Sequence, residues 1–306
     1  MFFSTIIPSH NRAHLLGATL DSALAQEFAD QEIIVVDAGS TDGTDAVLAR
    51  YAGRITVVRG EATGPGATRN LGIARARGEY IAFLDSDDLW FPWTLATYRR
   101  AIQEHSMPAF IAGTHVDFRD TSDSLPTTAA PFRATRYRDY LEAGTADNVW
   151  IGTCAVAVRA DVLRGVGGFA TSNVNAEDSD LWLRLGASPG FSRITSPPVF
   201  AYRRHDASAI ANLTRTHAGM LHLIEAERRG QYPGGTARQI VRWKILTGHT
   251  RPASIACLRG GMRTEAWQIF RATFRWNVSL GRAKYLLAFP LLAGCGLFSR
   301  APRAGS

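Results

Sequence analysis

The sequence predicts an α/β fold built on a doubly wound, mostly parallel sheet, and two observations support this. Short runs of β-branched and aromatic residues alternate with stretches of helical spacing over residues 1–90, which is typical of parallel sheets. The apolar runs also end in proline, glycine, serine and aspartate, which are typical of turns and helix N-caps. Because such sheets bind ligands beyond the carboxyl ends of their strands, function is expected there.

The elements follow in order along the amino-terminal part of the chain. Phe2–Ile7 is a strand ended by Pro8, and Ala13–Ala25 is a helix because its leucines recur at helical spacing. The other strands expected before residue 90 are Glu32–Val36, Ile55–Val58 and Tyr80–Leu84, and the other helices are Ala46–Tyr51 and Ala67–Arg75.

The remainder of the chain divides into a mixed part and a helical part. Thr121–Pro131 is polar and aperiodic and predicts a surface loop. Strands are expected at Trp150–Val158 and Pro197–Tyr202, and helices at Asp161–Val166 and Glu177–Leu185. After about residue 210 the strand pattern disappears, and we expect helices broken at Gly234-Gly235, Pro252 and Gly260-Gly261. The predicted domains are residues 1–210 and a helical extension, residues 211–306.

The charge is distributed unevenly. Residues 1–200 carry 17 basic and 23 acidic side chains, a net charge of −6, whereas residues 201–306 carry 17 basic and 4 acidic ones, a net charge of +13. Apolar residues make up 46% and charged residues 20% of the chain, which excludes wholesale disorder. Cys154, Cys257 and Cys295 form no CxxC pair, so we expect reduced thiols rather than a zinc site or disulfides.

Two aspartates directly follow the strand Tyr80–Leu84. Asp85 and Asp87 flank Ser86, so in extended backbone their side chains point the same way. Hard divalent cations such as Mg²⁺ and Mn²⁺ bind carboxylate oxygens together with substrate phosphates. The alternative is a solvated acidic turn, but the position at the carboxyl end of a strand favours a cation site.

Six segments resemble, in order and spacing, those of the family 2 glycosyltransferases of GT-A fold. They are IIPSHNR, EIIVVDAGSTDGT, GPGATRNLGIARARGEYIAFLDSDD, a GGF turn, AEDSDLWLRL and YRRHDAS. The resemblance covers the amino-terminal two thirds of the chain, and residues 211–306 lie outside it. It implies a Rossmann-like, mostly parallel sheet flanked by helices, and an inverting transfer of a sugar from a nucleotide diphosphate sugar.

The same resemblance implies a set of donor-binding residues. Pro8, Ser9 and Asp37 match the strand ends that hold the nucleoside in the family. Ala38 departs from the family, which commonly has a second polar residue there, so uridine is expected but the base stays open. Arg69 matches a position near the nucleotide, and its alternative is an exposed helix arginine.

The resemblance also implies a metal site and a catalytic base. Asp85 matches a position near the ribose and a divalent cation, Mn²⁺ or Mg²⁺, and Asp87 matches a ligand of that cation. His205 matches a further contact to the metal or diphosphate, or else it is a polar surface residue. The family places its base in a Glu-Asp pair, which Asp178 matches. The alternative is that Glu177 and Asp178 only complement the helix dipole.

The carboxyl-terminal third is basic and amphipathic. Apolar residues between Ala266 and Leu280 form one broad helical face, and a stripe of arginines lies beside it, namely Arg271, Arg275 and Arg282. The apolar run Tyr285–Phe298 would extend only about 21 Å as a helix, less than the roughly 30 Å of a bilayer core, so we expect no span. These features predict contact with an anionic membrane surface, with packing on the catalytic domain as the alternative. No nucleic-acid module is present, so nucleic acid is not expected as a partner.

Together these features predict a cytoplasmic, membrane-peripheral glycosyltransferase that acts on a glycan or lipid-linked acceptor in cell-surface polysaccharide or glycolipid synthesis. The opening segment Met1–Pro8 lacks the basic region of a secretory signal. One alternative is a sugar nucleotidyltransferase, but the lysine that follows the Gly-rich loop of that class is missing, since Lys244 is the first lysine. Another is a non-catalytic protein that binds nucleotide sugars or anionic surfaces, against which Asp85, Asp87 and Asp178 argue.

Overall fold

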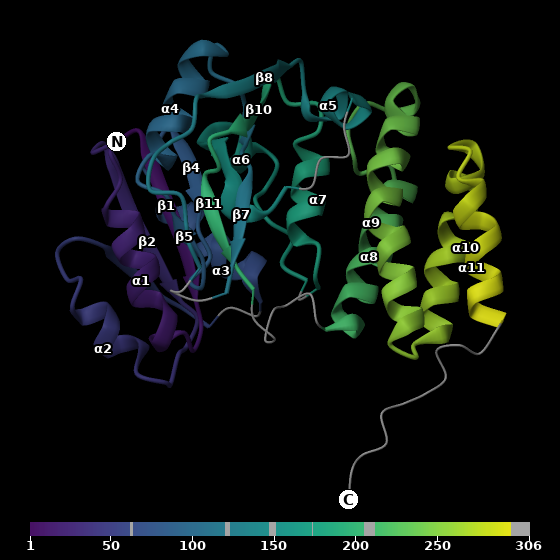
Figure 1. The fold of residues 1–306 in the computed structure, drawn as a ribbon, viewed down its shortest axis with the longest axis horizontal. Helices are drawn as coiled ribbons and strands as arrows, with labels where there is room; N and C mark the ends of the chain where they lie inside the picture. The colour runs from purple at the N-terminus through teal and green to yellow at the C-terminus, as the bar shows by residue number, and fades with distance from the viewer. Residues whose placement is uncertain (62–63, 120–122, 147–150, 173, 205–211, 295–306) are drawn as a thin grey trace, which may run out of the picture. The chain divides into compact units, whose positions relative to one another are not determined.

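The computed structural model describes residues 1–61, 64–119, 123–146, 151–172, 174–204 and 212–294 (Figure 1). The chain forms two compact units. The first comprises Met1–Ala143, Trp150–Asn173 and Glu177–Asp206, and the second comprises Gly144–Val149, Val174–Ala176 and Ala207–Ser306. The predicted boundary between residues 210 and 211 falls outside the described ranges and stays a prediction.

Eight strands form the central sheet of the first unit. They are β1 (Phe3–Ser9), β2 (Gln31–Asp37), β3 (Thr56–Arg59), β4 (Tyr80–Phe83), β6 (Phe110–Ala112), β8 (Arg133–Tyr137), β9 (Val156–Arg159) and β10 (Phe191–Ser196). Their order is β3-β2-β1-β4-β9-β6-β10-β8. The first four are mutually parallel, whereas β9 runs antiparallel between β4 and β6, and β8 runs antiparallel to β10. The sheet is therefore mixed around a parallel half.

Helices pack on both faces of this sheet. They are α1 (Ala13–Leu24), α2 (Thr44–Ala49), α3 (Pro65–Arg75), α4 (Thr94–Glu104), α6 (Ala160–Gly165) and α7 (Glu177–Arg184). Leu16 and Leu20 of α1 share a buried core with Ile7 of β1. The neighbouring Ile6 faces α3, where a Cβ atom at Gly72 would lie 2.6 Å from Ile6 Cγ2. Because adjacent strand residues face opposite sides, α1 and α3 cover opposite faces, as a doubly wound sheet requires.

Two further elements of the first unit refine the sequence-based expectations. A small sheet of order β5-β11-β7 joins β5 (Leu89–Trp90), β7 (His115–Phe118) and β11 (Phe200–Arg203). The strand expected over Trp150–Val158 is shorter, because residues 153–155 form a 3₁₀ turn before β9. In that turn the Cys154 carbonyl accepts a hydrogen bond from Trp90 Nε1 (3.0 Å), so it is not part of a strand ladder.

The second unit is helical in its described part, as the sequence predicts. Its helices are α8 (Leu213–Arg228), α9 (Gln239–Arg259), α10 (Arg263–Ser279) and α11 (Ala283–Gly294), and α5 (Tyr140–Ala146) links the two units. The expected breaks at Gly234-Gly235 and Gly260-Gly261 are confirmed. The break expected at Pro252 is wrong, because Pro252 lies inside α9. Buried residues flank it, including Thr250 and Ala253, and their packing offsets the lost backbone hydrogen bond.

Aromatic stacking and one buried ion pair hold these helices together. The rings of Trp243 and Trp276 stack at 5.8 Å, which joins α9 to α10. Arg242 Nε lies 2.7 Å from Glu227 Oε2, and both side chains are buried, which joins α9 to α8. None of the helices in the described ranges has the length and hydropathy of a membrane-spanning segment.

Candidate active site

Three strand ends that carry predicted site residues lie at one edge of the central sheet. Strand β1 lies between β2 and β4 and runs parallel to both, with Ser9 opposite Asp37 in the register. Strand β4 ends at Phe83, and the chain continues through Leu84 to Asp85. The fold therefore brings Ser9, Asp37 and Asp85 to the same edge, which is where ligands of such sheets bind.

Hydrogen bonds fix the loops after β1 and β2 to each other. Asn11, which has a left-handed φ of 52°, donates its backbone N–H to Ser40 Oγ (2.8 Å). Its side-chain Oδ1 accepts the N–H of Thr41 (2.8 Å). The ring of His10 bonds to the carbonyl of Ala38 (2.9 Å). The loops after β1 and β2, which are about 30 residues apart in sequence, thus hold each other in place.

The residues that are predicted to bind the nucleoside are largely buried beside these two loops. Asp37 Oδ1 accepts hydrogen bonds from Ser40 Oγ (2.5 Å) and from the Ser40 N–H (3.3 Å), which shapes the turn after β2. Ser9 Oγ is buried and has no hydrogen-bond partner in the described part of the chain, and Pro8 has no N–H to donate. A buried hydroxyl without a partner is costly until a ligand or water pairs with it.

The four residues after Leu84 alternate in burial. The side chains of Asp85 and Asp87 are 33% and 21% exposed, whereas Ser86 and Asp88 are buried. Asp85 and Asp87 are therefore the more exposed residues of this segment, which turns at Ser86 and Asp87. Arg12, from the loop after β1, places its Nε 3.7 Å from Oδ2 of Asp87.

Asp88 and Cys154 support this segment from the inside. Asp88 accepts the backbone N–H of Arg203 at Oδ1 (2.8 Å) and the thiol of Cys154 at Oδ2 (3.1 Å). The same sulfur accepts the backbone N–H of Asp85 (3.2 Å). Burial raises the pKa of the Cys154 thiol, and the charges of Asp85 and Asp88 add to the effect, so the thiol stays protonated as its bond to Asp88 requires.

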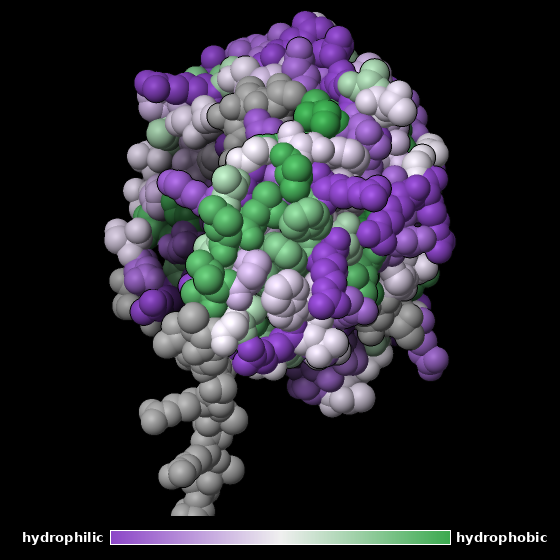
Figure 2. Space-filling model, turned by 90° about the vertical axis from the view of Figure 1, so that its right-hand side faces the viewer, coloured by the Kyte–Doolittle hydropathy of each residue, from purple (hydrophilic) through white to green (hydrophobic). Residues whose placement is uncertain are grey.

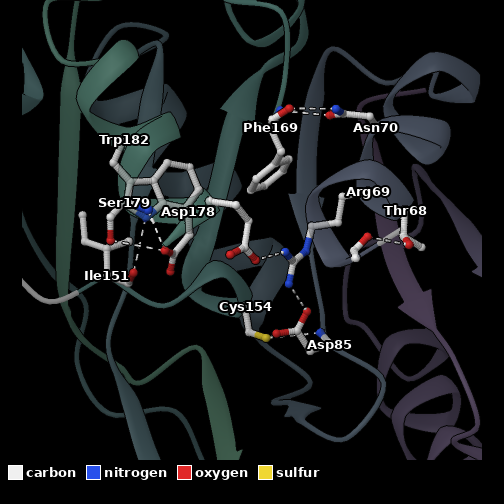
Figure 3. Close-up of polar contacts among 12 residues, drawn as sticks. Thr68, Arg69, Asn70, Asp85, Ile151, Cys154, Phe169, Asp178, Ser179 and Trp182 are labelled. Atoms are coloured by element: carbon white, nitrogen blue, oxygen red, sulfur yellow. Dashed lines mark hydrogen bonds and ion pairs between the residues drawn. The ribbon is translucent and has the colours of Figure 1, made fainter. Parts of the chain in front are cut away.

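Arg69 of α3 is buried between two carboxylates. Its Nη2 lies 2.7 Å from Asp85 Oδ1, as Figure 3 shows, and its Nη1 lies 2.9 Å from Glu177 Oε1. Burial opposes the charge of Arg69, but Asp85 and Glu177 outweigh it, so the pKa of the guanidinium is raised. The alternative of an exposed helix arginine is therefore wrong.

The residues around Arg69 fix its helix against the turn that contains Gly167-Gly168-Phe169. The Asn70 side chain accepts the N–H of Phe169 (2.9 Å) and donates to its carbonyl (2.8 Å), a reciprocal pair visible in Figure 3. A Cβ atom at Gly66 would lie 2.3 Å from the carbonyl oxygen of Ala170, so only glycine permits this approach.

Asp178 lies in the first turn of α7, next to Glu177. Its Oδ1 accepts hydrogen bonds from the N–H (2.6 Å) and Oγ (3.2 Å) of Ser179, and its Oδ2 accepts none from any described residue. Burial raises the pKa of Asp178 and of Glu177, and Arg69 opposes this rise. A half-buried carboxylate with one unengaged oxygen and a raised pKa is a stronger proton acceptor than an exposed aspartate.

A divalent cation fits the exposed carboxylates better than the buried group beside them. Asp85, Asp88 and Cys154 place ligand atoms within 4.8 Å of one another. However, Asp88 and Cys154 bond to each other, and a protonated thiol is a poor ligand for a hard cation. Asp85 Oδ2 accepts no hydrogen bond within the described ranges, and Asp87 is also partly exposed. These two carboxylates are the oxygen ligands that Mn²⁺ or Mg²⁺ prefers.

His205 lies outside the described residues. Asp180 is bound to Arg184 (2.8 Å), and Trp182 is buried in the core and donates to the carbonyl of Ile151. The sequence interpretation missed the contacts among Asp88, Cys154 and Arg203, which are distant in sequence and support the segment after β4.

The fold is that of a glycosyltransferase of GT-A fold. The chain belongs to glycosyl transferase family 2, whose family profile matches residues 4–165, more than half of the chain. A relative in Escherichia coli, named UDP-Glc:alpha-D-GlcNAc-diphosphoundecaprenol beta-1,3-glucosyltransferase WfgD, is 28% identical over 211 residues, which are 68% of this chain and 79% of that protein.

Two solved structures share the fold. TarS 1–349 of S. aureus, in complex with UDP-GlcNAc, superposes with a TM-score of 0.66 at 16% identity, covering 91% of this chain and 83% of TarS 1–349. The mannosyltransferase PcManGT from Pyrobaculum calidifontis, in complex with GDP-Man and Mn²⁺, superposes with a TM-score of 0.58 at 20% identity, covering 98% of this chain and 88% of that one. At these identities the likeness establishes the common fold.

Proposed function

We propose that this glycosyltransferase moves a sugar, with inversion, from a nucleotide diphosphate sugar to a glycan or lipid-linked acceptor in cell-surface polysaccharide synthesis. The observation that carries the proposal is that one guanidinium, Arg69, contacts both the aspartate after β4 and the acidic pair of α7. The candidate residues for holding the diphosphate and for accepting the proton are thus connected through Arg69.

The donor would bind at the edge formed by β1 and β2. The hydroxyl of Ser9, which has no partner among the described residues, and the carboxylate of Asp37 would contact the nucleoside, with Pro8 beside them. Uridine is the expected base, because the E. coli relative is named for UDP-glucose and the TarS structure holds UDP-GlcNAc. PcManGT holds GDP-Man on the same fold, so a panel of donors has to decide the base.

Asp85 and Asp87 would hold the divalent cation, and His205 remains a third candidate ligand. When bound, Mn²⁺ or Mg²⁺ supplies positive charge that stabilises the leaving diphosphate. The residues of this chain contribute the rest of the arrangement. Cys154 and Asp88 fix the backbone after β4, and Arg69 orients the Asp85 carboxylate through its Oδ1.

Asp178 would act as the base. In the transfer, the acceptor hydroxyl oxygen bonds to the anomeric carbon, the bond from that carbon to the diphosphate breaks, and the hydroxyl proton moves to Oδ2 of Asp178. The raised pKa makes this carboxylate a better proton acceptor than an exposed aspartate. Glu177 is tied to Arg69 and would position the base rather than accept the proton.

The acceptor is proposed from the chemistry of the relatives and the charge of this chain. The E. coli relative is named for a diphosphoundecaprenol acceptor, which is a lipid. Residues 201–306 carry 17 basic and 4 acidic side chains, which suits an anionic membrane. We therefore propose that the enzyme works at the cytoplasmic face of a membrane without spanning it.

The test is Asp178→Asn, after a thermal-shift panel of nucleotide sugars with and without Mn²⁺ has found a donor. The substitution keeps the size of the side chain and removes the base, so turnover should fall by roughly 10²- to 10⁴-fold while donor affinity changes little. Near-normal turnover would place the base elsewhere.

A matched control exists in the same unit. Asp161 also lies in the first turn of a helix, and its Oδ1 also accepts the next backbone N–H (2.7 Å). Asp161→Asn should leave turnover unchanged and cost under about 1 kcal/mol. Glu177→Gln is unsuitable as a neutral control because it breaks the contact with Arg69.

A further inference from the structure

The described part of the second unit exposes a group of large apolar side chains on its last two helices. Phe274 and Val278 of α10 are 46% and 53% exposed, and Leu287 and Leu291 of α11 are 70% and 67% exposed. Figure 2 shows hydrophobic residues gathered on the side of the molecule where α10 and α11 lie, with hydrophilic residues around them. We call these four residues the α10–α11 face.

The two leucines of the α10–α11 face are not part of the surface that holds the helices together, whereas the ring of Phe274 lies at its edge, 5.9 Å from that of Phe270. The rings of Phe270 and Phe289 stack at 4.5 Å between α10 and α11, and both residues are buried. Leu287 and Leu291 lie two residues to either side of Phe289, so they project from the opposite side of α11. The amphipathic helix expected from sequence thus uses much of its apolar face for internal packing, with Phe274 at its edge.

The charged residues of these two helices are almost all basic. Between residues 263 and 294 the only acidic residue is Glu265. The same stretch has five basic residues, of which four are exposed and one is partly buried: Arg263, Arg271, Arg275, Arg282 and Lys284. Arg271 lies over the ring of Trp267, with its guanidinium carbon 5.4 Å from the ring centre. Such long basic side chains can extend to a charged surface while their stems cover apolar groups.

We propose that the α10–α11 face docks on an anionic lipid membrane, with its leucines and Phe274 at the acyl boundary and the basic residues at the lipid headgroups. The proposal rests on the proposed function for its lipid-linked acceptor. Apolar side chains at i and i+4 on two adjacent helices, with basic residues around them, are the features of helices that lie in a membrane interface. Each basic residue near an anionic leaflet adds about fivefold to binding, equivalent to about 1 kcal/mol.

The charge pattern favours a membrane over other partners. A second copy would bring the same five basic residues against this face, and like charges in contact oppose association. A nucleic acid would contact the arginines but would leave the exposed leucines in water, because affinity for duplexes comes mainly from phosphate contacts. An anionic membrane is the partner that uses both kinds of side chain.

The experiment measures sedimentation of the full chain with vesicles. Binding is expected with equal parts phosphatidylglycerol and phosphatidylcholine, and little is expected with phosphatidylcholine alone. Leu287→Gln with Leu291→Gln should lower the partition coefficient by at least about tenfold, because two apolar insertions are lost. Met107→Gln is the matched control, since Met107 is an exposed apolar residue of the first unit, and it should bind normally.

The electrostatic part has its own pair of variants. Arg271→Gln with Arg275→Gln should weaken binding by roughly 25-fold, which is about fivefold for each arginine. Arg54→Gln with Arg75→Gln removes the same charge from exposed positions of the first unit and should have little effect. Binding should also fall steeply with salt, because the Debye length shrinks from about 10 Å at 0.1 M to about 3 Å at 1 M.

Three outcomes would overturn the docking proposal. One is absence of binding to anionic vesicles at low salt, and another is equal binding by the leucine variant and Met107→Gln. The third is a dimer in sedimentation velocity that only the leucine variant loses, which would assign the face to a second copy. Donor hydrolysis is measured on the same preparations. Loss of vesicle binding with intact hydrolysis refutes docking alone, whereas absence of hydrolysis with intact binding refutes the catalytic assignment alone.

Discussion

Replacing Arg69 by methionine would remove a positive charge that contacts both Asp85 and Glu177. Methionine keeps an unbranched apolar side chain against the ring of Phe169, which lies 5.2 Å from the guanidinium carbon. The substitution therefore changes charge more than packing. Its main consequence is that Glu177, whose side chain is only 12% exposed, loses its partner at 2.9 Å.

The size of the effect follows from the burial of the two carboxylates. Breaking a buried ion pair by removing one partner costs about 3–5 kcal/mol, because a buried charge is left uncompensated. Asp85 is 33% exposed, so its half of the arrangement resembles a surface pair worth about 0–1 kcal/mol. Glu177 therefore carries most of the loss, and we expect Arg69→Met to lower the free energy of unfolding by about 3 kcal/mol at pH 8.

The cost should depend on pH in a defined direction. Burial already raises the pKa of Glu177 while Arg69 lowers it, so removing Arg69 raises the folded-state pKa further above the unfolded value of about 4.3. A carboxyl with a raised folded pKa penalises folding at pH values above that pKa and stops doing so when both states are protonated. The destabilisation should thus be largest at pH 8 and smaller at pH 5.

Urea unfolding of wild-type and Arg69→Met protein at both pH values is the assay. Adding Glu177→Gln to Arg69→Met should restore much of the stability at pH 8, because the uncompensated charge is gone. A cost below about 1 kcal/mol at pH 8, an equal cost at pH 5, or no recovery in the double variant would refute the electrostatic reasoning.

Two other predictions concern the same edge of the sheet. Burial raises the pKa of Asp178, and the base must be ionised, so the acid limb of the kcat/KM profile should lie above the usual aspartate value of about 3.9. Arg69→Met should move this limb to higher pH. A flat profile from pH 4 to 8 would contradict the assignment. Asp87→Ala should abolish the Mn²⁺-dependent part of donor stabilisation in a thermal-shift assay, while the ligand-free protein melts normally. Donor binding that neither the substitution nor a chelator changes would refute the metal assignment.

The parts of the fold set by local pattern could be predicted from the sequence. Alternating strands and helices place Ser9, Asp37 and Asp85 at strand ends, and parallel pairing then brings those ends to one edge. Arg69 was assigned near the nucleotide by resemblance, and the structure adds that its contacts within the protein are to acidic side chains.

Contacts between distant residues could not be predicted in this way. Arg69 and Glu177 are 108 positions apart, and Asp88 and Cys154 are 66 positions apart, so no periodicity connects them. Cys154 was expected only as a reduced thiol, yet its sulfur bonds two aspartates of the segment after β4. The break predicted at Pro252 is wrong for a related reason, because the packing of buried residues on both sides of this proline outweighs its local tendency to end a helix.

The contacts of Arg69 also couple the charge of Asp85, after β4, to that of the acidic pair of α7. A cation on Asp85 and Asp87 would withdraw negative charge from Asp85, so Arg69 would be drawn more strongly towards Glu177. That shift would favour the ionised form of the acidic pair, which is the form a base requires, because a nearby positive charge lowers a carboxyl pKa. Metal and donor binding at one end would in this way prepare the base at the other. The acid limb of the kcat/KM profile would then differ from that of kcat, since the first reports the free enzyme and the second the loaded one.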